Sequence, residues 1–274
     1  MRRTRSILLP GLLLLAACGD DPPPPPKPAP PPPAPAPVQG VAPSRVAAVL
    51  APMNRGLALI ERYDYGGAAT EFAKAVALEP AFYPAQFNLS VALVNNQKDP
   101  AVSEKALRAA AALAPKEAAP HFMLGMLLTQ GVSPPRTKEA AVAFRRAAEL
   151  APGDADAHFR LGLAAKEDGR VEEAEREFTK ALDLNPFLGA ALYQRGLNRM
   201  QLDREEEGKA DLGRFKAMET AQRVDKRDIA YGFMGPLGNC IRDLDRWLPP
   251  GEPPLRARVV WAEAADAFAD PADG

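Results

Sequence analysis

Four prolines divide the middle of this 274-residue chain at nearly equal intervals. They are separated by 35, 37 and 34 residues and stand at Pro80, Pro115, Pro152 and Pro186. An alanine precedes each by five residues and a large apolar residue by eight, namely Ala75, Ala110, Ala147 and Ala181, and Phe72, Leu107, Phe144 and Phe178. A period of about 20 to 50 residues indicates stacked repeats, because one unit cannot bury its apolar face alone. We therefore expect a row of similar units.

Each unit carries two stretches with helical spacing. In one unit, apolar residues recur at helical intervals from Ala157 to Ala165 and again from Val171 to Leu182, a pattern typical of two amphipathic helices. Gly169 lies between these stretches and is suited to end the first helix. Pro186 prevents the second helix from continuing. The unit is therefore predicted to be a helical hairpin.

Small residues complete the pattern within each unit. They occupy two further positions in register, Gly56, Ser90, Gly125 and Gly162, and Ala68, Ser103, Ala140 and Ala174. A fifth copy lacks the closing proline and reads Gly196, Gly208, Leu212 and Phe215. Together these positions resemble the tetratricopeptide repeat over about residues 44 to 219. The resemblance implies an all-α fold, a right-handed α-solenoid of about five helix hairpins over residues 43–220, with a C-terminal helical extension over 221–274.

At the N-terminus, an apolar run opens with arginines and ends with Leu15-Ala16-Ala17 directly before Cys18. This pattern resembles the lipobox of bacterial lipoproteins. The resemblance implies a signal peptide over residues 1–17 and acylation of Cys18, with palmitate as one of the acyl groups. From Ser6 to Ala17 the run is shorter than the roughly 20 residues that span a bilayer. A soluble protein with a frayed apolar start is the alternative.

Proline dominates the residues that follow, with 12 of the 16 residues from Pro22 to Pro37. We expect residues 18–42 to be a disordered, extended linker, because proline fixes φ and donates no backbone hydrogen bond. A docking site for a proline-reading domain is the alternative. Gly19 stands where an aspartate would favour inner-membrane retention. The predicted location is therefore the bacterial cell envelope, with the periplasmic face of the outer membrane favoured.

Nothing in the composition or motifs points to chemistry. The net charge of −1 and the lack of a basic stripe argue against nucleic acid. His121 and His158 occupy the same repeat position and are interpreted as packing residues, with no metal set nearby. We expect no enzyme, cofactor, metal or small-molecule substrate. The rival hypothesis of an enzyme or an enzyme accessory subunit would need Cys240, or the carboxylates Asp228, Asp243 and Asp245, to converge on a cleft.

The family resemblance implies that the first helices of the hairpins line a concave groove. Ten side chains are expected to face into it: Met53, Leu57, Phe87, Val91, Phe122, Met126, Phe159, Leu163, Tyr193 and Leu197. Beside them lie Asn54, Asn88, Arg160, Lys166 and Gln194. This aromatic and aliphatic lining predicts an apolar or amphipathic segment of a protein partner as ligand. Half of the lining can belong to the family's framework, and the chain's own tail is the alternative occupant.

The tail after Thr220 permits several structures. Leu237 to Leu248 is predicted as a helix, because its apolar residues fall on one side. Residues from Leu255 to Ala269 suit either a capping helix or a strand. Some bacterial proteins combine these repeats, a segment like Ala230-Tyr231-Gly232, and an FG-GAP-type β-propeller. A truncated or degenerate relative of such proteins is therefore an alternative to the membrane-anchored scaffold.

Overall fold

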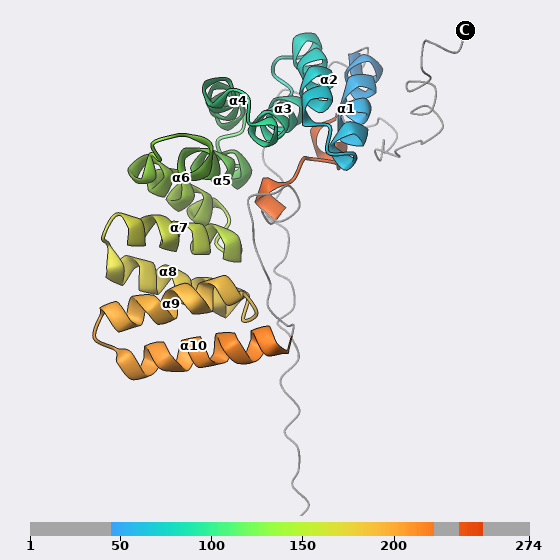
Figure 1. Ribbon diagram of the computed structural model, residues 1–274. Helices are drawn as coiled ribbons and strands as arrows, with labels where there is room; N and C mark the ends of the chain where they lie inside the picture. The colour runs from blue at the N-terminus through green and yellow to red at the C-terminus, as the bar shows by residue number, and fades with distance from the viewer. Residues whose placement is uncertain (1–44, 222–235, 249–274) are drawn as a thin grey trace, which may run out of the picture. The chain divides into compact units, whose positions relative to one another are not determined.

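The computed structural model describes residues 45–221 and 236–248. Over these residues it is all-helical, with ten α-helices and no strand (Figure 1). The helices are α1 Val46–Glu61, α2 Tyr65–Leu78, α3 Tyr83–Asn96, α4 Pro100–Leu113, α5 Ala118–Met126, α6 Thr137–Leu150, α7 Ala155–Glu167, α8 Val171–Leu184, α9 Gly189–Gln201 and α10 Glu205–Thr220.

Consecutive helices pair and stack in chain order. Each odd-numbered helix packs against the even-numbered helix that follows it, and each hairpin packs against the next (Figure 1). The described residues belong to one compact unit. This arrangement confirms the predicted solenoid of five hairpins.

In three of the five hairpins, the two helices meet where a glycine faces a phenylalanine ring. A Cβ atom added to Gly56, Gly125 or Gly162 would lie 2.4, 2.6 or 2.6 Å from the ring of Phe72, Phe144 or Phe178. These separations are far below a van der Waals contact, so only glycine allows the ring to lie flat against the first helix. The small residues of the repeat are therefore required by the close approach of the helices.

The turns inside the hairpins share one backbone conformation. Left-handed φ values of 59°, 54°, 77° and 58° recur at Tyr63, Gln97, Gly169 and Asp203. After this residue the chain reverses, and the Arg170 backbone N–H donates to the Ala165 carbonyl at 2.8 Å. Gly169 ends its helix as the sequence predicts. In the third hairpin, α5 instead continues as a π-helical turn over Leu127–Gly131.

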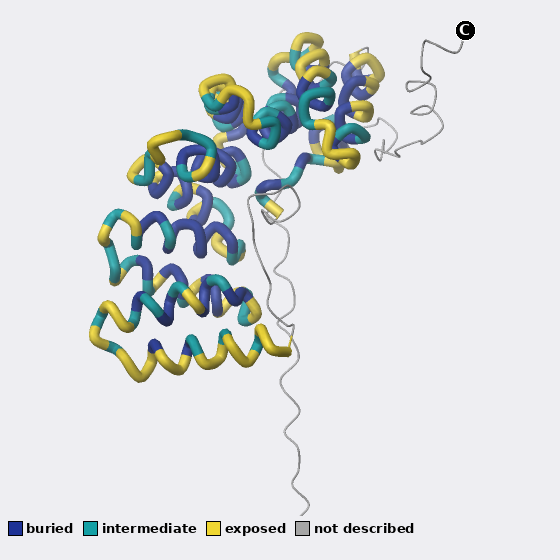
Figure 2. Tube along the Cα trace, in the orientation of Figure 1, coloured by how far each residue is buried: buried dark blue, intermediate teal, exposed yellow. Residues whose placement is uncertain are grey.

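The last hairpin is held by buried charge as well as apolar contact. Arg195 of α9 donates two hydrogen bonds to Asp211 of α10, at 2.8 and 2.7 Å. Arg199 adds a third to Asp211 at 2.9 Å. Removing one member of such a network leaves an uncompensated buried charge. Along α10 only Gly208 and Asp211 are buried, and Figure 2 shows that most of this helix is exposed.

The predicted helix over Leu237–Leu248 is wrong. Two three-residue 3₁₀ turns, Pro236–Gly238 and Asp245–Trp247, flank a stretch without helical structure. The apolar side chains that suggested a helix instead pack against the core of the solenoid. The backbone of Ile241 is bound by the side chain of Asn88 and not by its own segment.

Several sequence-based predictions lie outside the described residues. They concern the signal peptide at 1–17, the linker at 18–42, Asp228, Ala230-Tyr231-Gly232 and residues 255–269. Within the part of the chain that the structure describes, no helix combines the length and the apolar character needed to cross a bilayer.

The glycine–phenylalanine contact yields a stability prediction. Replacing Gly162 with alanine forces a methyl group against Phe178 and should lower the free energy of unfolding by about 1–3 kcal/mol. Gly213 in α10 has no atom within 4 Å of an added Cβ. The matched change Gly213→Ala should therefore raise stability by about 0.5–1 kcal/mol. Urea denaturation measures both, and equal effects of the two substitutions would contradict the contact.

Candidate functional site

The odd-numbered helices carry equivalent residues on one face. Met53, Phe87, Phe122, Phe159 and Tyr193 occupy one repeat position, and the next position holds a column of mostly polar residues: Asn54, Asn88, Met123, Arg160 and Gln194. We call this second set the inner column. The Lys166 Nζ of α7 donates to the Gln194 Oε1 of α9 at 2.9 Å, so neighbouring odd-numbered helices meet on this face.

Six of the ten predicted groove residues are buried at the N-terminal end of the stack. Met53, Leu57, Phe87, Val91, Phe122 and Met126 expose at most 4% of their surface. Phe159 is also buried, whereas Leu163 and Leu197 are partly exposed and Tyr193 is 42% exposed. Surface for an additional partner is therefore offered by α7 and α9, and much less by α1, α3 and α5.

The aromatic residues of the first position serve the hairpins. Phe122 packs edge-on against Phe144 with ring centroids 5.8 Å apart, and Phe159 lies 6.0 Å from Phe178. Tyr193 lies 5.5 Å from Phe215. In each case the partner is on the second helix of the same hairpin. These rings are structural, which is the reason that the buried ones leave no free face for a ligand.

Residues 236–248, which we call the resident segment, cover the N-terminal part of this face. Figure 1 shows the segment in orange beside α1 and α3. Asn88 of α3 binds it by two hydrogen bonds to one residue: its Nδ2 donates to the Ile241 carbonyl at 2.9 Å, and its Oδ1 accepts from the Ile241 N–H at 2.7 Å. Because both bonds are to backbone, Asn88 holds an extended chain irrespective of the side chain at that residue.

Apolar side chains of the resident segment enter the core of the solenoid. Cys240, Leu244 and Trp247 are 5%, 0% and 8% exposed, and they belong to the same apolar cluster as Phe87. The Trp247 ring lies 4.6 Å from that of Tyr83, centroid to centroid. Burial raises the pKa of the Tyr83 hydroxyl well above its usual range, so this group stays neutral.

The sequence determines locally where Tyr83 and Asn88 lie. Pro84 stands in the first turn of α3, where its missing N–H costs nothing. Tyr83 and Phe87 are four residues apart and stack at 5.9 Å. Asn88 follows Phe87 and so lies beside this aromatic pair.

Two arginines of the resident segment pair with carboxylates of the solenoid. Arg242 pairs with Glu61 at the end of α1, and Arg246 pairs with Glu117, just before α5, at 2.6 Å. The guanidinium of Arg246 also lies 4.9 Å from the Trp247 ring centroid. The covered site is thus apolar in the middle and acidic at two points on its rim.

A comparison with known proteins agrees with this geometry. Residues 155–188, which comprise α7 and α8, match the tetratricopeptide repeat family. This stretch is a tetratricopeptide repeat. No curated protein sequence matches the chain.

Solved structures of tetratricopeptide repeat proteins share the fold. The MamA structure from Desulfovibrio magneticus RS-1 is 20% identical, with a TM-score of 0.57 over 64% of this chain and 96% of that one. YrrB, described as a TPR protein with an unusual peptide-binding site, is 20% identical, with a TM-score of 0.52 over 60% and 83%. The hairpins of this chain are therefore packed as in tetratricopeptide repeat solenoids.

The uncovered part of the repeat face combines apolar and polar groups. Leu163, Tyr193 and Leu197 contribute apolar surface on α7 and α9. Arg160 of the inner column lies with its guanidinium carbon 5.7 Å from the centroid of the Phe159 ring. Burial lowers the pKa of Lys166, and the Nζ of this lysine donates a hydrogen bond to the Gln194 side chain. This surface continues the column in which Asn88 binds the resident segment.

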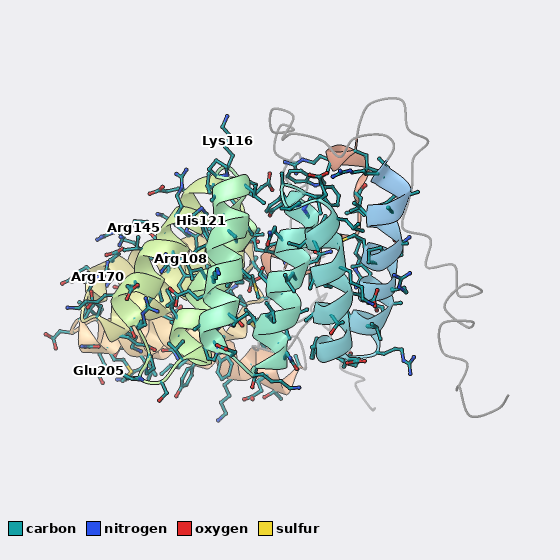
Figure 3. The ribbon with its side chains drawn as sticks, turned by 90° about the horizontal axis from the view of Figure 1, so that it is seen from above. Arg108, Lys116, His121, Arg145, Arg170 and Glu205 are labelled. Carbon is teal, nitrogen blue, oxygen red and sulfur yellow. The ribbon has the colours of Figure 1, made fainter. Side chains whose placement is uncertain are left out.

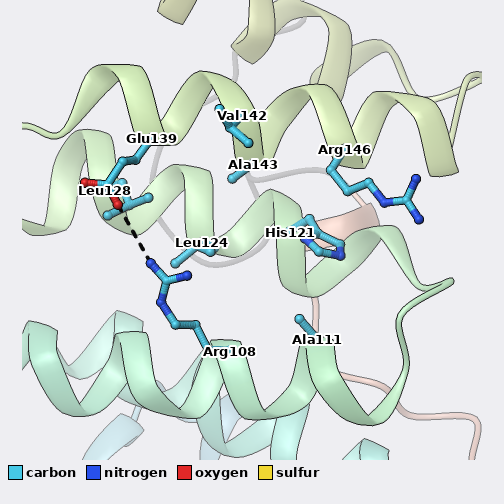
Figure 4. Close-up of a pocket in the computed structure, with 9 residues that line it drawn as sticks. All are labelled: Arg108, Ala111, His121, Leu124, Leu128, Glu139, Val142, Ala143 and Arg146. Carbon is cyan, nitrogen blue, oxygen red and sulfur yellow. Dashed lines mark ion pairs between the residues drawn. The ribbon is translucent and has the colours of Figure 1, made fainter.

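A separate hollow lies among α4, α5 and α6 (Figure 4). It measures about 550 Å³, and its lining is Arg108, Ala111, His121, Leu124, Leu128, Glu139, Val142, Ala143 and Arg146. Burial, and secondarily the charge of Arg146, lowers the pKa of His121.

Figure 3 shows Lys116 and Glu205 pointing outward from the solenoid, away from this hollow. Nothing in the hollow resembles a catalytic set.

His158 is buried in packing, with its Nδ1 2.7 Å from the Glu177 carboxylate and its Nε2 3.2 Å from the Pro152 carbonyl. Burial raises the pKa of Glu177, but the hydrogen bonds from His158 and Lys180 lower it by more. The net shift of this pKa is therefore downward. Over residues 45–221 and 236–248, no three His, Cys, Asp or Glu side chains gather as a metal site would require.

Sequence reasoning placed Asn88 beside the groove but missed its role, and it missed Tyr83, Glu61 and Glu117 altogether. One signal was available. An asparagine inside an apolar stretch of helix needs hydrogen-bond partners when it is buried, and an unwound segment supplies them. No local pattern identifies which segment that is, because Ile241 lies 153 residues away.

Proposed function

We propose that this chain is a non-catalytic scaffold that binds an apolar or amphipathic segment of another protein. The observation that carries the proposal is the backbone clamp of Asn88 on Ile241. It supports the proposal because both hydrogen bonds are to backbone groups, which any protein segment can supply. YrrB, which shares the fold, is described as having a peptide-binding site.

The partner's binding surface is proposed on α7 and α9. Tyr193, Leu163 and Leu197 supply exposed or partly exposed apolar area. The partly exposed Gln194 continues the inner column that holds Asn88, whereas Arg160 is only 7% exposed and lies below this surface. A partner segment laid across this surface would bury apolar side chains while its backbone meets the polar column. The remaining predicted positions, which are buried, would support the surface from below.

We further propose that the scaffold is anchored to a membrane of the bacterial cell envelope, with the periplasmic face of the outer membrane favoured. The support is the sequence Leu15-Ala16-Ala17-Cys18 after an apolar run, followed by Gly19. Acylation adds about 0.8 kcal/mol per buried CH₂, and more than one chain gives stable attachment. The proline-rich residues 18–42 would then separate the repeats from the membrane surface.

Metabolic labelling with a palmitate analogue tests the anchor. We expect the wild-type protein to carry the label and to sediment with membranes. Cys18→Ser should abolish both properties, whereas Cys240→Ser should keep both, because Cys240 lies in the solenoid core. An unlabelled wild-type protein, or a labelled Cys18→Ser variant, would contradict the anchor.

Site-specific photo-crosslinking tests the binding surface. Benzoylphenylalanine placed at Tyr193 should form an adduct with a discrete protein in envelope preparations. The same group at Tyr63, which is 69% exposed in the turn after α1, should not. Leu197→Asp should abolish the adduct by charging the proposed surface, whereas Val142→Asp on α6 should leave it unchanged. Equal adducts at both tyrosines, or an adduct indifferent to Leu197→Asp, would refute the proposed surface.

A further inference from the structure

We propose that the resident segment occupies a second peptide site, and that a partner segment of the same chemistry displaces it. The partner would be an extended stretch with apolar residues in the places of Leu244 and Trp247 and basic residues in the places of Arg242 and Arg246. This inference rests on the proposed scaffold function. It assigns to α1, α3 and α5 a site that is closed by the chain itself.

The main contact of this site recognises a backbone and not a particular residue. Asn88 exchanges two hydrogen bonds with the N–H and carbonyl of Ile241. An asparagine side chain offers one acceptor and a donor in the arrangement that a single extended residue matches. A foreign segment therefore satisfies Asn88 as well as the resident one does. The contact fixes where a segment lies without fixing its sequence.

Side-chain contacts on both sides of Asn88 supply the selectivity. Leu244 is fully buried, and the Trp247 ring packs on Tyr83 at 4.6 Å. Glu61 and Glu117 face Arg242 and Arg246, four residues apart in the segment. Carboxylates at both points favour a basic segment and oppose an acidic one.

The way in which the resident segment is attached permits exchange. Its helical turns are only three residues long, so it has little structure of its own. Both ion pairs are partly exposed, with 53% and 35% of the arginine side chains accessible, and such pairs contribute only about 0–1 kcal/mol each. The segment is covalently joined to α10 through residues 222–235, so its binding in cis competes with any partner segment. A partner must overcome that competition, which lowers its apparent affinity.

A labelled peptide comprising residues 236–248 serves as the probe, with fluorescence anisotropy and a reducing buffer. Full-length wild-type protein should bind it weakly, because the site is filled. The full-length variant with Leu244→Asp and Trp247→Ala should bind it at least tenfold more tightly, because its own segment no longer competes. Equal binding to the two proteins, or no binding to either, would overturn the inference.

Two asparagines of α3 provide a matched pair of controls. In the weakened-segment variant, adding Asn88→Ala should abolish probe binding. Adding Asn95→Ala should not, because Asn95 donates only to the Val91 carbonyl of its own helix. Circular dichroism checks that each variant folds. Retained binding after Asn88→Ala would refute the backbone clamp.

A charge exchange tests the acidic rim without disturbing the core. A probe with Arg246→Glu should bind the weakened-segment variant at least fivefold more weakly, and adding Glu117→Arg should restore it. Failure to restore binding would contradict the proposed recognition of basic residues.

Crosslinking at Tyr193 tests the proposed binding surface on α7 and α9, at the other end of the stack. If the weakened-segment variant does not bind the probe while the Tyr193 crosslink still forms, this inference alone is refuted. If the probe binds while the Tyr193 crosslink does not form, the scaffold surface alone is refuted.

Discussion

A phenylalanine ring lying on a glycine holds the two helices of a hairpin together and sets their register. Gly162 and Phe178 illustrate the contact, in which an added Cβ would approach the ring to 2.6 Å. Because the same contact recurs in other hairpins, equivalent residues of the odd-numbered helices fall on one face. The inner column is a product of that repetition. Gly56 and Gly125 make the same contact, whereas the hairpin that carries Asn88 has Ser90 at this position.

Repetition also separates packing from binding. The aromatic residues of the first position turn toward their own hairpin, as Phe122 does against Phe144. The adjacent position is free to vary, and it carries asparagine, arginine and glutamine at Asn88, Arg160 and Gln194. At this position, the Asn88 side chain binds the backbone of Ile241. The same framework therefore gives a closed site at one end of the stack and an accessible surface at the other.

The sequence was sufficient for the fold because its signals are local and repeated. Gly169 lies in a left-handed turn that ends its helix, where the pattern predicted it. The site was harder to predict. Phe122 and Phe159 were assigned to the groove from register alone, although their burial depends on the second helices. Leu237–Leu248 has helical spacing, yet its backbone finds a partner 153 residues away, which periodicity cannot reveal.

Amide hydrogen exchange at Ile241, followed by NMR in the full-length protein, tests most directly whether the repeat face holds an extended chain through its backbone. The N–H of Ile241 donates to Asn88 at 2.7 Å, whereas an amide in an unbound segment would meet water. Exchange of this amide should be at least tenfold slower than in the isolated peptide. Exchange at the rate of the isolated peptide would contradict it.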